Sequence, residues 1–184
     1  MLGNRFDRAL EYAHSLHRSQ KRKGGDIPYI SHLLAVSALV IENGGSEDQA
    51  IAGLLHDAAE DQGGQATLDA IEREFGSGVA RIVADCTDSW VEPKPPWRPR
   101  KEAYLATLAG KPSASLLVSL ADKVHNAEAI LYDYKEIGDE LWPRFKGGAE
   151  GTRWYYSELA KVFAEAMPGR LAERLGRTVA AFET

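Results

Sequence analysis

The chain contains 184 residues, with 22 Lys and Arg against 27 Asp and Glu, which gives a formal net charge of −5. This length and a hydrophobic fraction of 44% predict one globular domain over residues 1–184. Collagen-like, disordered and membrane-spanning classes are excluded, because glycine and proline are not enriched and no apolar run approaches the ~18 residues of a membrane span. The acidic balance also argues against DNA or RNA as a partner, and no membrane is expected to take part.

The N-terminal segment has no apolar run behind a basic start, so no secretory signal is expected and a cytoplasmic location follows. The one cysteine, Cys86, has no partner for an internal disulfide and cannot build a thiolate zinc site. Any metal ion must therefore be held by histidine and carboxylate side chains. Nothing in the sequence indicates an oligomeric state.

Apolar residues recur at helical spacing through most of the chain, and no alternating run is long enough to predict a strand, so the expected fold is an all-α helical bundle. In the first half, polar caps and glycine stops predict helices over residues 4–23, 31–43, 46–61, 67–75 and 79–87. The clearest start is Ser46, because Gln49 three residues later can complete a capping box. The first of these helices is expected to end in the basic cluster Lys21, Arg22 and Lys23.

Prolines dominate the next segment, so residues 89–99 are expected to form a loop. This loop and the residues just after it hold two indoles and four basic side chains, which could bind a nucleotide or could form a rigid surface loop docked on the core. Helices are then expected over 100–108, 113–134, 152–166 and 169–182, with a flexible stretch at 147–151. The helix over 113–134 is apolar on nearly all sides, which predicts a central position.

Four ionisable residues interrupt an apolar helix: His56, Asp57, Glu60 and Asp61. Residues three or four apart share a helix face, so all four can address one cleft. Burying several carboxylates together costs several kcal/mol per charge unless a cation neutralises them, which indicates a divalent metal ion. The alternative is an exposed acidic helix end with His56 packed on the core.

Two further residues lie on faces that must point inward. His32 shares the apolar stripe of its helix, and Asp122 is embedded in the most apolar helix of the chain. Taken singly, each also fits a structural role, as a hydrogen-bonded core histidine or as half of a buried ion pair. Together with His56 and Asp57 they supply two imidazoles and two carboxylates, a donor set that suits Mn, Fe, Zn or Mg and leaves positions for water and substrate.

The order His32, His56–Asp57 and Asp122 resembles that of HD-domain metal-dependent phosphohydrolases. Surrounding stretches narrow the likeness to hydrolase domains of the RelA/SpoT type and stand-alone small alarmone hydrolases, over about residues 5–165. These stretches are Gln-Lys-Arg-Lys, Pro-Tyr-Ile-Ser-His, Leu-Leu-His-Asp-Ala-Ala-Glu-Asp, Thr-Asp-Ser and Leu-Ala-Asp-Lys-Val-His-Asn.

This resemblance implies that one divalent metal ion, Mn²⁺ or another, is bound by four residues: His32, His56, Asp57 and Asp122. It further implies that Glu60 and Asp61 organise or activate the attacking water. The reaction implied is removal of the 3′-pyrophosphate from guanosine tetra- or pentaphosphate.

The same resemblance implies an anionic nucleotide substrate. Arg22 would stack on its base beside Lys23, Asn126 would contact the nucleotide, and Tyr155 would contact the ribose. Alternatives remain for each: the two cations could be a solvated helix end, and Asn126 could bond the backbone. Tyr156 is a close rival to Tyr155, and both tyrosines could simply pack in the core.

The sequence departs from the family pattern after Asn126, where Ala-Glu-Ala replaces a stretch that usually carries a positive charge. A phosphate contact is therefore expected to be missing, which leaves a phosphatase acting on another nucleotide, such as NADPH or a nucleoside phosphate, as an alternative. A non-catalytic nucleotide-sensing HD module is a second alternative, against which the retained Glu60–Asp61 pair argues. His14 and His125 are not expected to be ligands.

Overall fold

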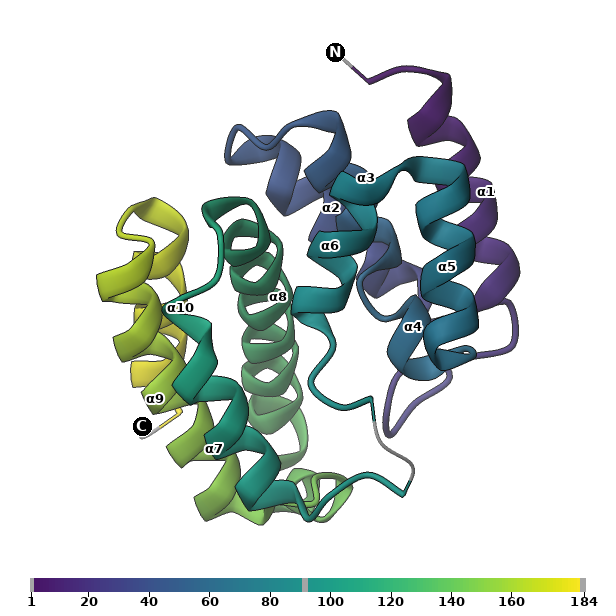
Figure 1. The fold of residues 1–184 in the computed structure, drawn as a ribbon. Helices are drawn as coiled ribbons and strands as arrows, with labels where there is room; N and C mark the ends of the chain where they lie inside the picture. Colours follow the sequence, from purple (N-terminus) through teal and green to yellow (C-terminus); the bar gives the residue numbers. More distant parts are fainter. Residues whose placement is uncertain (1, 91–92, 183–184) are drawn as a thin grey trace.

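The computed structural model describes residues 2–90 and 93–182, and these residues form helices joined by turns and loops (Figure 1). In chain order the α-helices are α1 (Asn4–Leu16), α2 (Ile30–Glu42), α3 (Glu47–Leu55), α4 (Ala58–Asp61), α5 (Gly64–Phe75), α6 (Ser77–Cys86), α7 (Trp97–Leu108), α8 (Ser113–Ile137), α9 (Gly148–Ala166) and α10 (Arg170–Ala180). A 3₁₀ segment that the sequence did not predict, η1 (Gly138–Arg144), follows α8. Within the two described ranges the β pairing amounts to one isolated bridge, so the all-α prediction is confirmed.

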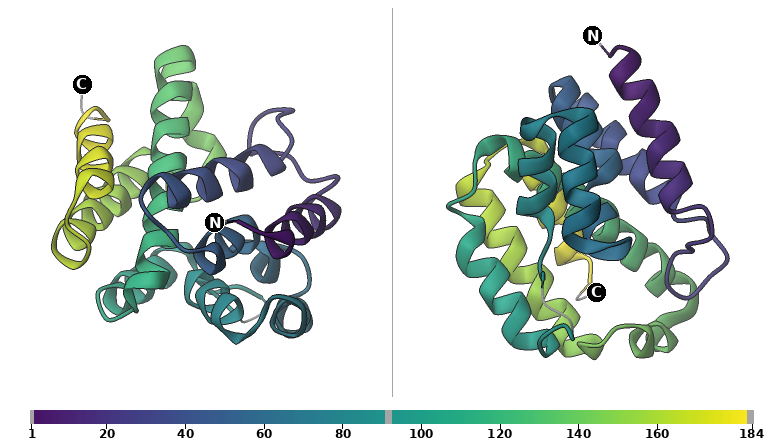
Figure 2. Two further views of the ribbon diagram at one scale, coloured as in Figure 1. Left: turned by 90° about the horizontal axis from the view of Figure 1, so that it is seen from above. Right: turned by 45° about the vertical axis from the view of Figure 1, so that its right-hand side comes forward.

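Helix α8 lies at the centre of the bundle, as its apolar sequence predicts. It packs against α2, α3 and α6 and also against α9, α10 and η1, and the left view of Figure 2 shows it between the N-terminal and C-terminal helices. Its residues 115–122 are all buried. Asp122, at the end of this run, is therefore a carboxylate in the interior and needs a partner. No helix in the described part of the chain has both the length and the apolar character to cross a membrane.

The helix expected over residues 46–61 is interrupted at His56 and Asp57, so the prediction of one continuous helix is wrong there. The His56 ring gives the reason: its Nδ1 lies 2.9 Å from the carbonyl oxygen of Gly53, the group that a continuous helix offers to the backbone N–H of Asp57. Gly53 packs closely against α2, since a Cβ atom there would lie 3.0 Å from the Cα of Ser37.

The basic cluster lies in the connection between α1 and α2 rather than at a helix end. This connection folds back on itself through hydrogen bonds from Arg22 N to Ile27 O and from Tyr29 N to Gln20 O, each 2.9 Å long. Gly24, with φ of +81°, supplies the left-handed backbone conformation that the reversal needs. This backbone pairing replaces the helix expected from the basic cluster, and it brings Arg22 close to Tyr29.

Helix α7 begins at Trp97, inside the loop expected over 89–99, because the first turn of a helix tolerates a proline and Pro99 lies in that turn. Residues 91–92 of the expected loop lie outside the described residues. The Trp97 ring packs against the start of α9, where a Cβ atom on Gly147 would lie 2.7 Å from it. Residues 147–151, which the sequence predicted to be flexible, are therefore packed against Trp97, and α9 begins there at Gly148.

The capping box at Ser46 is confirmed. Its hydroxyl accepts from Gln49 N at 3.3 Å, and Gln49 Oε1 accepts from Ser46 N at 2.8 Å. Ser46→Ala removes half of this exchange, so we expect the free energy of unfolding to fall by about 1 kcal/mol in urea denaturation followed by circular dichroism. Ser157→Ala within α9 is the control and should change stability by less than about 0.5 kcal/mol. Equal stability of Ser46→Ala and the unsubstituted chain would contradict the contribution of this cap.

Candidate metal centre

Four side chains from three parts of the chain meet beside α8. His32 comes from α2, His56 and Asp57 from the turn between α3 and α4, and Asp122 from α8. The Nε2 atoms of the two histidines lie 3.3 Å apart. Asp122 Oδ1 lies 3.2 Å from His32 Nε2 and 3.6 Å from His56 Nε2. Asp57 Oδ2 lies 3.6 Å and 3.0 Å from the same two nitrogens.

These separations fit a bound cation. At metal–ligand distances of about 2.1 Å, neighbouring ligands lie ~3.0 Å apart around an octahedral ion and ~3.4 Å apart around a tetrahedral one. The donor atoms of His32, His56 and Asp57 are mutually close enough to share one ion, and Asp122 reaches both ring nitrogens. Nitrogen and oxygen donors without a thiolate suit Mn, Fe, Zn or Mg. The group therefore has the composition and spacing of a divalent-metal site.

Burial makes this cluster costly unless its charges are balanced, since His32 is 0% exposed and Asp122 is 6% exposed. Burial alone would raise the pKa of Asp57, but the neighbouring His56 and His32 outweigh it and hold that pKa well below its ordinary value. Burial also opposes ionisation of Asp122, yet Lys123 and the two histidines hold its pKa well below the ordinary value. Both carboxyl groups are therefore in the anionic form that a metal ligand requires.

Each histidine of the cluster has a second contact through its other ring nitrogen, an arrangement usual for metal-binding histidines. The Nδ1 of His56 contacts the backbone carbonyl of Gly53, as described above. The Nδ1 of His32 lies 2.8 Å from the Nδ1 of His125, which belongs to α8. One histidine is thus oriented by the main chain and the other by a side chain.

The two carboxylates are also held from outside the cluster. The Tyr29 hydroxyl donates a hydrogen bond of 2.5 Å to Asp57 Oδ2. The Lys123 ammonium donates one of 2.5 Å to Asp122 Oδ2, and the Asn126 amide donates to Asp122 Oδ1. Hydrogen bonds of this kind fix which carboxylate oxygens face the histidines.

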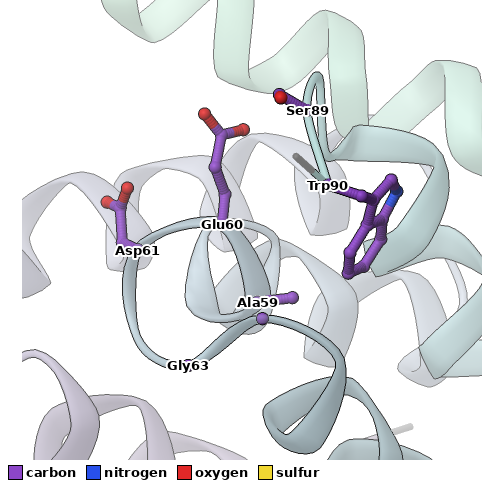
Figure 3. Close-up of a pocket in the computed structure, with 7 residues that line it drawn as sticks. Ala59, Glu60, Asp61, Gly63, Ser89 and Trp90 are labelled. Atoms are coloured by element: carbon purple, nitrogen blue, oxygen red, sulfur yellow. The ribbon is translucent and has the colours of Figure 1, made fainter. Parts of the chain in front are cut away.

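Glu60 and Asp61 lie in α4, directly after the break, and line a pocket of about 410 Å³ together with Trp90 (Figure 3). In Figure 3 both carboxylates point to the same side of α4, away from the Ala59 side chain. Lys94 Nζ donates to Glu60 Oε1 at 2.8 Å, and Gln20 Nε2 donates to Asp61 Oδ2 at 2.8 Å. Burial raises the pKa of each carboxyl group. A raised pKa makes a carboxylate a stronger proton acceptor near neutral pH.

The proline-rich loop and the start of α7, together called the proline-rich segment below, supply cations to the acidic side of this site. Asp88, from the Thr-Asp-Ser stretch, donates its backbone N–H to Glu60 Oε2 at 3.2 Å. Its carboxylate accepts from Arg100 Nη1 at 2.6 Å and from Lys101 Nζ at 2.5 Å, and these cations lower the pKa of Asp88 to about 2 although burial opposes the shift. With Lys94 on Glu60, three of the four basic side chains of the segment therefore pair with carboxylates at the candidate site.

Comparison with models of known protein families identifies the family of this chain. The family model for the HD domain matches residues 9–140, a range that contains all four clustered donors. The chain belongs to the HD-domain family. An HD domain implies use of a divalent metal, and the His32, His56 and Asp57 donors form a group that could hold one.

Curated relatives extend the comparison of this HD domain. The guanosine-3′,5′-bis(diphosphate) 3′-pyrophosphohydrolases MESH1 of Xenopus tropicalis and Homo sapiens are each 36% identical to it over 137 residues, which is 73% of this chain and 72% of theirs. A GTP pyrophosphokinase of Streptomyces coelicolor is 35% identical over 135 residues, which is 71% of this chain but 15% of that protein. This HD domain thus matches most of the first two proteins and a small part of the third.

Solved structures share the fold of this HD domain. A metazoan ortholog of SpoT that hydrolyzes ppGpp superposes with a TM-score of 0.79 at 22% identity, over 98% of this chain and 96% of that one. A protein from Listeria monocytogenes superposes with a TM-score of 0.72 at 26% identity, over 83% of this chain and 99% of that one. The helical arrangement of this chain is therefore shared with both solved proteins.

Two of the residues expected to bind the nucleotide in this HD domain lie next to the four-residue cluster. Arg22 Nη2 donates to Asn126 Oδ1 at 2.8 Å, and Asn126 in turn contacts Asp122. The Arg22 guanidinium lies 5.8 Å from the centre of the Tyr29 ring. Lys23 follows Arg22 in the same connection and is exposed. Arg22 and Asn126 are therefore linked directly to a candidate metal ligand.

The two tyrosines considered for the ribose contact have different neighbours. Tyr155 packs edge-on to Trp97 with ring centres 6.1 Å apart, and within the described part of the chain its buried hydroxyl has no hydrogen-bond partner. Burial raises the pKa of Tyr156, whose charged neighbours include Asp122 and Arg22. The ribose contact of Tyr155 stays a prediction, and Tyr156 stays its rival.

From the sequence, Tyr29 and His125 had no assigned role, and Lys94 counted only among four basic side chains that could bind a nucleotide. A signal for Tyr29 existed, because it stands three residues before His32 in the Pro-Tyr-Ile-Ser-His stretch. His125 also follows Asp122 by three residues, which places both on one face of α8. Lys94 contacts Glu60, which stands 34 residues earlier in the chain, and helical periodicity gives no signal for a contact over that separation.

Proposed function

We propose that this HD domain is a metal-dependent phosphohydrolase that removes the 3′-pyrophosphate from guanosine tetra- or pentaphosphate. The observation that carries the proposal is the convergence of two imidazoles and two carboxylates from α2, the α3–α4 turn and α8, with two further carboxylates following in α4. The identity to MESH1 proteins, which bear this activity in their name, supports the choice of substrate.

The metal would be held by the four side chains of the cluster, His32, His56, Asp57 and Asp122. When bound, a divalent cation, which we propose to be Mn²⁺, polarises the phosphoryl group and lowers the pKa of the attacking water. The contacts of Tyr29 and Lys123 keep the two carboxylates in place for this role.

Glu60, with Asp61 beside it, accepts the proton of the attacking water. The water oxygen bonds to the phosphorus attached to the ribose 3′ oxygen, the bond between that phosphorus and the 3′ oxygen breaks, and pyrophosphate leaves while the 3′ oxygen takes up a proton. Lys94 and the Asp88 N–H hold the two oxygens of Glu60, so its carboxylate is oriented before substrate binds.

The nucleotide would lie on the Arg22 side of the cluster. Arg22 stacks on the base with Lys23 beside it, Asn126 contacts the nucleotide, and Tyr155 contacts the ribose. Because Asn126 already joins Arg22 to Asp122, a base held by Arg22 lies close to the cation that acts on its phosphates.

A second candidate function is a phosphatase acting on another nucleotide, such as NADPH or a nucleoside phosphate. The observation that favours it is the place of Glu128, which follows Asn126 by two residues and forms a bidentate pair with Arg174 at 2.5 Å and 2.7 Å. The family pattern usually carries a positive charge in this stretch, and a free cation there would favour binding of a highly charged substrate. This chain has a carboxylate instead, and that carboxylate is already paired with Arg174. A nucleotide sensor without turnover is the remaining alternative. A sensor does not need to activate water, so the presence of Glu60 and Asp61 argues against it.

The test is a substrate panel with the full chain. Guanosine tetra- and pentaphosphate, NADPH and nucleoside phosphates are incubated with the protein and Mn²⁺, and products are separated by anion-exchange chromatography. We expect GDP or GTP plus pyrophosphate from the first two substrates, and loss of turnover in EDTA that Mn²⁺ restores. Turnover of only NADPH or nucleoside phosphates, and not of guanosine tetra- or pentaphosphate, would contradict the proposal and support the second candidate function. Binding of these nucleotides without turnover would contradict it and support the sensor.

Arg22→Ala tests the nucleotide side separately. Loss of base stacking worth about 1–3 kcal/mol should raise KM about 10-fold or more with a smaller change in kcat. Lys21→Ala is the matched control, since the Lys21 ammonium pairs with Asp26 at 2.5 Å on the exposed side of the same connection. Equal KM values for the Arg22→Ala and Lys21→Ala variants would contradict the role of Arg22.

A further inference from the structure

The two ring nitrogens of His32 face different surroundings. Its Nε2 lies 3.2 Å from Asp122 Oδ1 and 3.3 Å from His56 Nε2, inside the donor cluster. Its Nδ1 lies 2.8 Å from the Nδ1 of His125 on α8, and the ring centres of these two histidines are 4.8 Å apart. The side chain of His32 is fully buried, so His125 is the group that meets its second nitrogen.

Imidazole chemistry fixes the hydrogen positions that this geometry allows. A neutral imidazole presents a lone pair to a metal ion only from the nitrogen that carries no hydrogen. If His32 binds through Nε2, its Nδ1 carries the hydrogen and donates it. His125 Nδ1 must then be the acceptor, which places the hydrogen of the His125 ring on its Nε2.

His56 shows the contrasting arrangement. Its Nδ1 lies 2.9 Å from the Gly53 carbonyl, an oxygen that can only accept, so the main chain fixes its tautomer. The partner of His32 can be either donor or acceptor, and it is a side chain that substitution can remove. His32 is therefore the donor of the cluster whose tautomer depends on one other side chain.

We propose that His125 is a positioning residue that fixes the tautomer and ring orientation of His32 for metal binding. This inference rests on the proposed metal-dependent function. It also assigns a double role to α8, which supplies Asp122 as a donor and, three residues later, the support of a donor on α2. Removing such an outer partner commonly weakens metal binding by about 10–100-fold.

Metal affinity of the full chain tests the proposal without an activity assay. Mn²⁺ binding is measured by equilibrium dialysis with elemental analysis for the unsubstituted chain, His125→Phe and His125→Gln. Phenylalanine keeps a planar ring but offers no acceptor, so the Kd should rise about 10–100-fold. The glutamine carbonyl restores an acceptor, so His125→Gln should bind several-fold more tightly than His125→Phe. His14→Phe is the matched control, because His14 is exposed on α1, and its Kd should be unchanged.

A second measurement uses the unsubstituted chain and does not depend on how a variant folds. Two-bond nitrogen–proton NMR correlations of the Zn²⁺-loaded protein report which ring nitrogen of each histidine carries the hydrogen. We expect hydrogen on Nδ1 of His32 and on Nε2 of His125. Hydrogen on Nδ1 of His125, or an unchanged Kd for folded His125→Phe, would overturn the role of His125 alone. Absence of divalent-metal binding by the unsubstituted chain would overturn the proposed metal site together with it.

Discussion

Asp122→Ala is expected to release the bound metal and to lower turnover by at least on the order of 10²–10³-fold. Asp122 is the donor that α8 brings to the cluster, and its Oδ1 lies within 3.6 Å of both histidine Nε2 atoms. No carboxylate before it on α8 can replace it, because residues 115–121 are apolar or hydroxyl-bearing and buried. Elemental analysis of the dialysed protein and turnover with the best substrate of the panel measure the two effects.

The fold must be checked in the same experiment, since Asp122 also neutralises Lys123, whose side chain is 15% exposed. Removing one partner of such a pair leaves an uncompensated charge. Asp122→Asn keeps the shape and an oxygen and serves as the second variant if the alanine variant unfolds. Asp133→Ala is the control on the same helix, because Asp133 is half-exposed and pairs with Arg144 at 3.3 Å. Full metal content in folded Asp122→Ala would show that the donor set is wrong.

Glu60→Gln is expected to lower kcat by about 10²–10⁴-fold while the metal stays bound. Glutamine keeps the size of the side chain and can still accept from Lys94, but it cannot accept the proton of the attacking water. Metal content and KM should change little, because Glu60 is held by Lys94 and the Asp88 N–H rather than by the four-residue cluster. Single-turnover kinetics with guanosine tetraphosphate separate the chemical step from binding.

Glu72→Gln on the exposed side of α5 is the control for this substitution and should retain unsubstituted kcat. Two outcomes would contradict the assigned role of Glu60. One is unchanged kcat in Glu60→Gln, which would transfer proton acceptance to Asp61 or another group. The other is loss of metal from Glu60→Gln, which would make Glu60 part of the metal site.

The sequence predicted the all-α fold and the central place of α8 because both depend on local patterns. Residues 113–121 carry no charged side chain and are mostly apolar on all sides of the helix, a pattern typical of a helix that is enclosed by others. The four clustered donors were predictable for a related reason. His32 and Asp122 stand on faces that must point inward, where an isolated polar group is costly, so they had to find partners in the interior.

Other features depend on contacts that periodicity does not record. The break at His56 arises when a side chain contacts the Gly53 carbonyl, and a pattern of apolar residues is the same with or without it. The connection between α1 and α2 is shaped by backbone pairing around Gly24, which overrides the helix suggested by its basic residues.

The proline-rich segment shows the same limit of local patterns. The sequence left open whether it binds a nucleotide or docks on the core. In the structure Trp97 packs against α9, whereas Lys94 pairs with Glu60 in the candidate site. Trp90 is 46% exposed and lines the pocket beside Glu60. One segment therefore serves both packing and the site, and its side chains divide between them.

Anomalous diffraction from crystals grown with Mn²⁺ would locate the ion that the four-residue cluster is proposed to bind. We expect one strong anomalous peak with His32 Nε2, His56 Nε2 and one oxygen each of Asp57 and Asp122 at about 2.0–2.3 Å. Absence of a peak among these four side chains, or a peak at another place in the chain, would contradict the proposed metal site.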